Sequence, residues 1–136
     1  MKRTATANWQ GTGKDGKGTV STQSGVLSNT AYSYKSRFEE GIGTNPEELV
    51  GAAHAGCFTM KLSFLLSGAG FTPDNIDTKA TITLDNGAIT SSHLEVKVSA
   101  PGLEQEKFAE LAAEAKANCP ISKLLNTEIT MDATLV

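Results

Sequence analysis

The chain has 136 residues, the size of one ordinary domain, so we predict a single domain over residues 1–136 with one functional site. A formal net charge of −3 with 20% charged residues argues against nucleic acid or an anionic membrane as the main partner. No apolar run follows the basic residues near the start, so we expect no signal peptide, no membrane span and a cytoplasmic location.

The first 38 residues indicate β structure interrupted by turns. Residues 4–9 and 17–21 flank the glycine-rich segment 11–16, which predicts a first hairpin. After a polar stretch, residues 32–38 alternate aromatic and polar side chains, as in a half-buried strand. This predicted strand carries Arg37 just before the next element.

A helix start is the clearest local signal in the sequence. Asn45 suits the N-cap, and Pro46 suits the first helical position because its missing N–H has no partner there. Glu47 and Glu48 then place two carboxylates at the positive end of the helix dipole. Glu48, at the third helical position, fits a capping-box role.

The segment that follows is apolar or small at nearly every position. Residues 49–66 contain no proline, so we predict a long helix that protein covers on most sides. We expect it to be too short and too rich in Gly, His and Lys for a membrane span. We expect the helix to end at Gly68 or Gly70.

Two more strands and a second helix follow. Residues 80–84 and 94–98 alternate in character around Asn86-Gly87, which predicts a second antiparallel hairpin. An amphipathic helix is predicted over residues 103–118, and residues 128–136 form a last strand. The predicted fold class is α+β, with antiparallel strands around a long central helix and a second helix.

The two cysteines, Cys57 and Cys119, are either inert buried thiols or a chemical pair. Cys57 lies about 12 residues past the predicted N-cap, roughly 18 Å along the axis, so the helix terminus cannot activate it. A reactive thiolate there needs a cationic neighbour, because burial alone raises the pKa of a thiol. Arg37 is the best candidate, since its fork can hold a thiolate and a carboxylate together; the alternative is an ordinary surface arginine.

Cys119 is placed to resolve an oxidised Cys57. Pro120 ends the second helix at or before Cys119, where we expect the backbone to move more freely than in mid-helix. Attack of the Cys57 thiolate on a peroxide would give a sulfenic acid, with which Cys119 condenses to form a disulfide. The alternative is a permanent cross-link, worth about 4 kcal/mol in the chain-entropy model.

His54 lies one turn before Cys57 and permits three interpretations. It can act as a general base for Cys57, or as a metal ligand with Cys57 and Cys119 in a non-catalytic binding domain. A closed zinc site requires four ligands. The only other histidine, His93, lies in a predicted strand among polar residues. A satisfied, partly buried histidine is therefore favoured, and we expect no metal. No nucleotide-binding motif occurs, so we expect no organic cofactor either.

The order of several segments is similar to a known family. Residues 44–49, Thr-Asn-Pro-Glu-Glu-Leu, followed by residues 52–58, Ala-Ala-His-Ala-Gly-Cys-Phe, resemble the signature of the OsmC/Ohr thiol peroxidases. His54 and the Arg37-Phe38 placement resemble the OsmC branch. Gly56 stands where the family most often has alanine, a small-for-small change that bears on packing. Supporting segments in family order are residues 18–22, 37–39, 70–73 and 117–122.

The resemblance implies a peroxidase that acts on organic hydroperoxides and hydrogen peroxide in oxidative and osmotic stress defence. It also implies an OsmC-like intertwined homodimer with active sites at the subunit interface, and reduction by a dithiol such as a lipoylated protein. Its catalytic residues would be Cys57, Cys119, Arg37 and Glu47.

Glu47 is the catalytic carboxylate implied by the family motif, although by itself it is also a plain helix-start carboxylate. Ten positions separate Glu47 from Cys57, about 15 Å along a helix with a rotation of roughly 80°. One straight helix cannot bring them together. We therefore predict that at least one of Arg37, Glu47 and Cys57 comes from the other subunit.

Overall fold

The computed structural model describes residues 1–136, and the chain divides into two units, Met1–Leu49 and Val50–Val136. Helix α2 (Pro46–Gly68) begins in the first unit and continues in the second. The assignment of the whole chain to a single domain stays a prediction.

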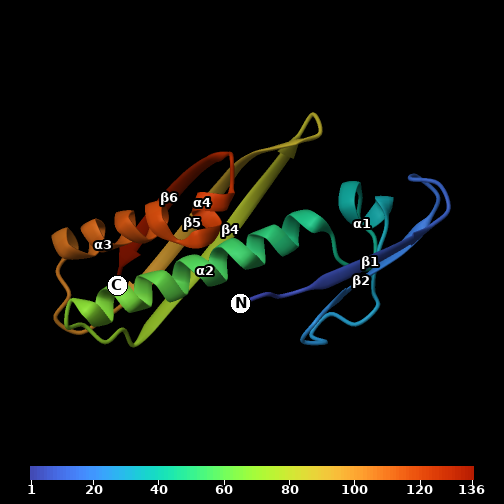
Figure 1. The fold of residues 1–136 in the computed structure, drawn as a ribbon. Coiled ribbons are helices and arrows are strands. Elements are labelled where there is room, and N and C mark those ends of the chain that lie inside the picture. Colours follow the sequence, from blue (N-terminus) through green and yellow to red (C-terminus); the bar gives the residue numbers. More distant parts are fainter. The chain divides into compact units, whose positions relative to one another are not determined.

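The first unit contains a three-stranded antiparallel sheet (Figure 1). Its strands are β1 (Ala5–Gln10), β2 (Lys17–Thr22) and β3 (Thr30–Tyr32). The β1–β2 pair confirms the predicted first hairpin. Gly18 lets the Trp9 and Tyr32 rings approach to 5.2 Å between centroids, because a Cβ at this position would lie 2.5 Å from Trp9.

The predicted strand over residues 32–38 is wrong beyond Tyr32, because Tyr34–Phe38 forms the short helix α1. A capping box begins it: the Ser36 N–H donates to the Ser33 hydroxyl, and the Ser33 N–H donates to the Ser36 hydroxyl. These two bonds satisfy backbone N–H groups within the segment itself, whereas in a strand the same groups would need a neighbouring strand as partner. Arg37 therefore projects from a helix.

Helix α2 starts and stops where the sequence predicts. The Glu48 N–H donates to Asn45 Oδ1 at 2.8 Å, which is the expected N-cap bond. At the other end, the Phe71 N–H donates to the Leu66 carbonyl at 2.9 Å across Gly70, whose φ is +92°. This is a Schellman ending, in which glycine takes the left-handed position.

The second unit contains the sheet β4-β5-β6, with β4 (Asn75–Asp85), β5 (Ala88–Ser99) and β6 (Glu128–Leu135). Positive φ angles at Asn86 and Gly87 confirm the predicted hairpin turn between β4 and β5. One pair departs from the antiparallel arrangement, since β6 runs parallel to β5. The helices α3 (Gln105–Asn118) and α4 (Pro120–Leu124) supply the crossover that a parallel pair requires.

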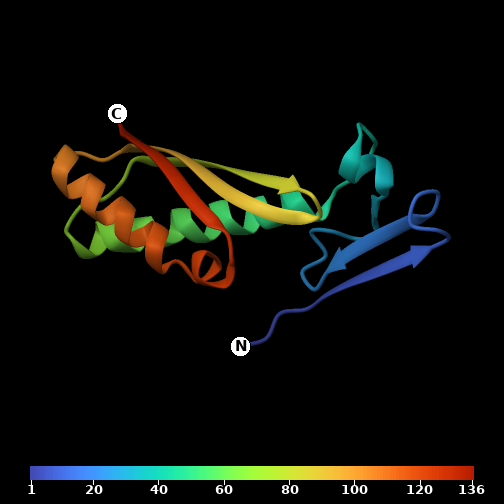
Figure 2. The ribbon, with the colours of Figure 1, turned by 90° about the horizontal axis from the view of Figure 1, so that it is seen from above.

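Helices α2 and α3 lie on the same face of this sheet, as Figure 2 shows. The face of β5 that points toward them is buried, while its opposite face carries charged residues such as Glu95 and Lys97. Apolar side chains from both helices and β5 form the core: Phe58, Leu62, Leu66, Leu94, Val96, Val98, Phe108, Leu111, Ala112 and Ala115. This core fixes where the inward-facing residues of α2 lie.

Only one face of α2 is buried within the chain, contrary to the expectation of cover on most sides. An exposed stripe runs along it, at Ala53, Gly56, Met60 and Phe64. Helix α2 is long and apolar enough to cross a membrane. The expectation that this helix is too short for a membrane span was therefore wrong. One such helix is weak evidence, because the core helix of a soluble protein meets the same criterion.

Candidate active site

The thiol half-site, Cys57 with Cys119, lies in the second unit. Cys57 is partly buried on α2, and Cys119 is fully buried at the junction of α3 and α4. Both thiols are free. Cys119 belongs to the same apolar core against which Cys57 packs, so the fold brings the two predicted cysteines together.

The surroundings of Cys57 in this unit do not favour its thiolate. Burial is the main influence and raises the pKa of the Cys57 thiol, and neighbouring Cys119 raises it further. A backbone hydrogen bond from Ile121 and the charge of Lys61 lower the pKa, but the net shift is upward. Within this unit the surroundings of Cys57 therefore favour the neutral thiol over the thiolate.

Cys119 has little of the freedom expected at a helix end. It stands between two helices in extended conformation and caps α4, accepting from the Ser122 N–H at 3.3 Å. The Ser122 hydroxyl lies 3.0 Å from the Cys119 sulfur. The sulfur is thus fixed in position before any reaction.

His54 is fully buried, and serine hydroxyls satisfy both of its ring nitrogens. Nδ1 lies 2.6 Å from Ser92 Oγ, and Nε2 lies 2.8 Å from Ser122 Oγ. Burial lowers the pKa of His54 and so favours the neutral ring. The prediction of a satisfied histidine is confirmed, although His54 is fully buried where partial burial was expected, and neither nitrogen is directed at Cys57.

The metal-binding alternative finds no support in this arrangement. Cys57, Cys119 and His54 do not form a group of ligands that could hold a metal ion. His93 is engaged elsewhere, with Nδ1 2.6 Å from Thr130 Oγ1 and Nε2 3.2 Å from Asp132.

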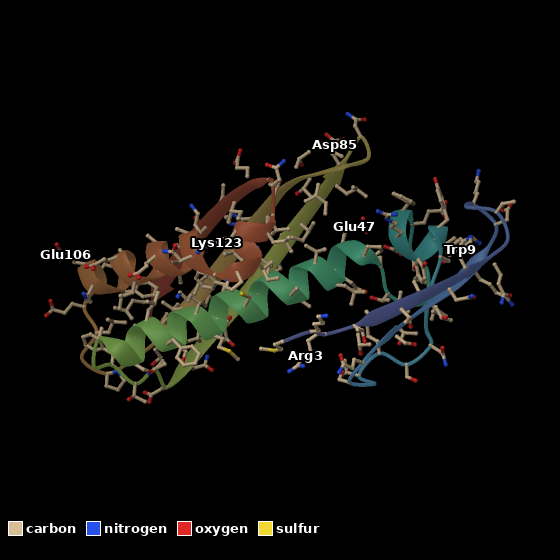
Figure 3. All side chains as sticks on the ribbon, viewed as in Figure 1. Arg3, Trp9, Glu47, Asp85, Glu106 and Lys123 are labelled. Carbon is tan, nitrogen blue, oxygen red and sulfur yellow. The ribbon has the colours of Figure 1, made fainter.

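The ion-pair half-site, Arg37 with Glu47, lies in the first unit. The Arg37 Nε and Nη2 atoms donate to Glu47 Oε1 at 2.9 and 2.7 Å. Glu47 stands in the first turn of α2 (Figure 3), and its side chain is only 13% exposed, against 39% for Arg37. The Arg37 guanidinium also lies over the Phe38 ring, 5.1 Å from its centroid. Sequence reasoning therefore paired the right two residues.

Glu48 differs from its predicted role. Its N–H is capped by Asn45, but its carboxylate accepts from the Thr44 hydroxyl at 2.8 Å. The two neighbouring carboxylates thus have separate partners, and only Glu47 engages Arg37.

Sequence reasoning missed Ser92 and Ser122, which join the buried polar network of His54. A signal for Ser92 existed, because it continues the inward-facing alternation of Leu94, Val96 and Val98 and is therefore a polar residue at a core position. Ser122 lies in the family-like segment 117–122, but its place beside His54 was not predicted because helix α4 was not predicted.

The sequence pattern of the OsmC-like protein family matches residues 39–134 of this chain. The chain belongs to the OsmC family. Peroxiredoxin OsmC of Escherichia coli K12 is 51% identical over 133 residues, covering 95% of this chain and 93% of that protein. A Staphylococcus epidermidis protein named organic hydroperoxide resistance protein-like 2 is 29% identical over 90% of this chain and 89% of its own length.

The fold agrees with the family assignment. The crystal structure of an OsmC-like protein from Mycoplasma pneumoniae superposes with a TM-score of 0.78 at 14% identity, covering 100% of this chain and 98% of that one. The predicted family and the α+β OsmC-like fold are thereby confirmed.

Proposed function

We propose that this OsmC-family chain is a Cys-based peroxidase that reduces organic hydroperoxides and hydrogen peroxide, with Cys57 as the nucleophile and Cys119 as the resolving thiol. The peroxidase class rests on the relation to a peroxiredoxin at 51% identity. The observation that carries the residue assignment is the meeting of two free thiols at one core.

Arg37 supplies the positive charge that Cys57 lacks in its own unit. A guanidinium carries five N–H donors, and the bonds to Glu47 engage only Nε and Nη2. Donors therefore remain for a thiolate, and Glu47 fixes the plane of the fork. A thiolate bound in this way is stabilised by charge-assisted hydrogen bonds, which lowers the pKa of the thiol.

The reaction then has two steps. The Cys57 thiolate attacks the distal peroxide oxygen, an S–O bond forms, the O–O bond breaks, and the alkoxide leaves as the alcohol after taking a proton. Cys119 next attacks the sulfur of the Cys57 sulfenic acid; an S–S bond forms and the S–O bond breaks with release of water. An external dithiol reduces the disulfide, and a lipoylated protein is one reductant of this class.

A homodimer is the assembly in which this site works. The stripe Ala53, Gly56, Met60 and Phe64 runs along α2 opposite the core, and the Phe64 side chain is 71% exposed. Small residues followed by large apolar ones allow a second copy of α2 to approach closely and bury the stripe. In such a dimer the ion-pair half-site of one subunit completes the thiol half-site of the other.

A cytoplasmic location accompanies this function. Two thiols that must alternate between reduced and disulfide forms need a compartment in which dithiols are kept reduced. We expect the free Cys57 and Cys119 to be the resting state there.

Single-turnover peroxide reduction tests the assignment. Wild type, Cys57→Ser and Cys119→Ser are each mixed with one equivalent of cumene hydroperoxide, and remaining peroxide and free thiols are counted. We expect wild type to lose both thiols, Cys119→Ser to consume peroxide but stop at a sulfenic acid, and Cys57→Ser to leave the peroxide intact. Consumption by Cys57→Ser at the wild-type rate would refute the proposed nucleophile.

A further inference from the structure

We propose that Ser122 and His54 form a proton relay for the resolving thiol, in which the Cys119 proton passes to Ser122 Oγ while the Ser122 proton passes to His54 Nε2. The inference rests on the proposed function, because it concerns the second step of that reaction. His54 acts through Ser122 and is a positioning residue for the proton, whereas Ser122 contacts the reacting sulfur.

The geometry is a continuous chain of contacts across the core of the second unit. The Cys119 sulfur lies 3.0 Å from Ser122 Oγ, Ser122 Oγ lies 2.8 Å from His54 Nε2, and His54 Nδ1 lies 2.6 Å from Ser92 Oγ. Cys119, His54 and Ser92 are 0% exposed and Ser122 is 8% exposed. Solvent therefore has little access to the Cys119 proton, and the hydroxyl of Ser122 is its nearest acceptor.

Burial of these polar side chains in an apolar core is unfavourable, and efficient packing of the core does not require them. Three separate elements, α2, β5 and α4, each place one polar side chain inside an otherwise apolar cluster. Buried polar groups are tolerated when hydrogen bonded, and none of these is left without a partner. Apolar residues at His54, Ser92 and Ser122 would fill the same space, so the network points to a chemical task.

The hydrogen bonds that link Cys119, Ser122 and His54 can reverse their donor and acceptor roles without movement of a heavy atom. In the reduced protein the Cys119 thiol donates to Ser122 Oγ, the Ser122 hydroxyl donates to Nε2, and Nδ1–H donates to Ser92 Oγ. After transfer, Nε2–H donates to Ser122 Oγ and the Ser122 hydroxyl donates to the Cys119 thiolate. The Ser122 backbone N–H, 3.3 Å from the sulfur, supports the same thiolate.

The resolving step needs such an acceptor because the thiolate, not the thiol, attacks sulfur. No lysine or arginine side chain is hydrogen bonded to Cys119, so His54 is the base that its contacts reach. The S–S bond forms as the S–O bond of the sulfenic acid breaks, and the leaving hydroxide takes up a proton to become water. His54 then gives up the proton it received, so the products balance as a disulfide and water.

The state of His54 suits this role. Burial lowers its pKa, so the ring is neutral before the step, and Nε2 can accept the proton of the Ser122 hydroxyl beside it. The same burial disfavours the protonated ring, which favours the return of the relay to its starting arrangement.

The experiment separates the two steps in single turnover with cumene hydroperoxide. Peroxide loss reports the first step, and decay of the sulfenic acid, trapped with dimedone at successive times, reports the second. His54→Gln keeps a hydrogen-bonding side chain that cannot take up a proton, and Ser122→Ala breaks the link to the sulfur. We expect each to slow the second step about 100-fold, the size of a general-base contribution, with the first step within about twofold of wild type.

Two measurements distinguish proton transfer from structural damage. Ser122→Thr keeps the hydroxyl and should resolve far faster than Ser122→Ala. In His54→Gln the second step should become about tenfold faster per pH unit, because the thiolate must then form by simple ionisation. Wild type should show a weaker dependence.

Resolution by His54→Gln and Ser122→Ala at the wild-type rate would overturn the relay, as would resolution by Ser122→Thr that is as slow as resolution by Ser122→Ala. If His54→Gln fails to fold, Ser122→Ala still provides the test. Failure of wild type to form any sulfenic acid would instead refute the proposed peroxidase chemistry, so the two failures are distinguishable.

Discussion

The two half-sites differ in how their residues are held. In the first unit, Arg37 on the short helix α1 and Glu47 in the first turn of α2 make a two-point ion pair at a partly exposed surface. In the second, Cys57 and Cys119 meet at an apolar core, where burial raises the pKa of the Cys57 thiol. One half-site has charge without a nucleophile, and the other has nucleophiles without enough charge. This difference is the reason for the proposal that the two half-sites act together and that neither is active alone.

Breaking the proposed dimer should have the largest effect on activity. Met60→Glu places a carboxylate in the exposed stripe of α2, and its burial against a second copy would be unfavourable. We expect monomers in sedimentation velocity and peroxide reduction close to the uncatalysed background. Glu114→Lys, an exposed change on α3, is the control and should leave both the assembly and the rate unchanged. A fully active Met60→Glu monomer would contradict the account.

Changing the ion pair should have the next largest effect. Arg37→Lys keeps the charge but loses the planar fork that can bind a carboxylate and a thiolate together, so the rate constant of peroxide reduction should fall about 100-fold. Glu47→Gln keeps the shape of the side chain and should cost less. Stopped-flow kinetics measures both, and the sulfenic acid, once formed, should resolve at the wild-type rate. A normal first step in Arg37→Lys would remove Arg37 from the site.

Loss of a buried hydrogen bond in the thiol half-site should be visible in stability. Ser92→Ala leaves His54 Nδ1 without its partner at a fully buried position, which should lower the free energy of unfolding by about 1–3 kcal/mol. Urea titration followed by circular dichroism measures the change. Ser91→Ala, at the neighbouring and less buried position of β5, is the matched control and should change stability little. Equal losses in both variants would show that the Ser92–His54 hydrogen bond adds no stability beyond that of an ordinary serine of β5.

The smallest effect is expected from the cap that holds the ion-pair half-site. Asn45→Ala removes the side-chain acceptor of the Glu48 N–H and should lower stability by about 1 kcal/mol. Glu47 lies two residues after Asn45, so a less stable helix start should hold Glu47 less firmly. The rate of peroxide reduction should therefore fall slightly as well. Asn45→Asp restores the cap acceptor and should recover stability. A stability unchanged by Asn45→Ala would show that Pro46 alone sets the helix start.

Local features of the fold were predictable because a few neighbouring residues decide them. Asn45 and Pro46 start α2, and Asn86 with Gly87 turns the second hairpin. Helix α1 was not predicted, because a short alternation of aromatic and polar residues is also typical of a strand. The capping box formed by Ser33 and Ser36 was not recognised in the sequence. Where such short signals conflict, caps are more informative than alternation.

Features set by distant residues were not predictable. The parallel pairing of β6 with β5 depends on a crossover through α3 and α4, which no local pattern encodes. The meeting of His54 with Ser92 and Ser122 joins three elements far apart in the chain. The contact of Arg37 with Glu47 and the meeting of Cys57 with Cys119 nevertheless join residues that the sequence pointed to. The cysteines and Arg37 followed from the chemistry of a thiolate, whereas Glu47 followed from the family motif.

Subunit complementation tests the central claim most directly. Arg37→Lys and Cys57→Ser proteins are purified as separate inactive or impaired homodimers, then unfolded together and refolded as a mixture. If the half-sites join across subunits, each mixed dimer contains one intact site, and random mixing should restore about a quarter of wild-type activity. Activity no higher than the mean of the two parent proteins, with mixed dimers verified by native mass spectrometry, would contradict the account.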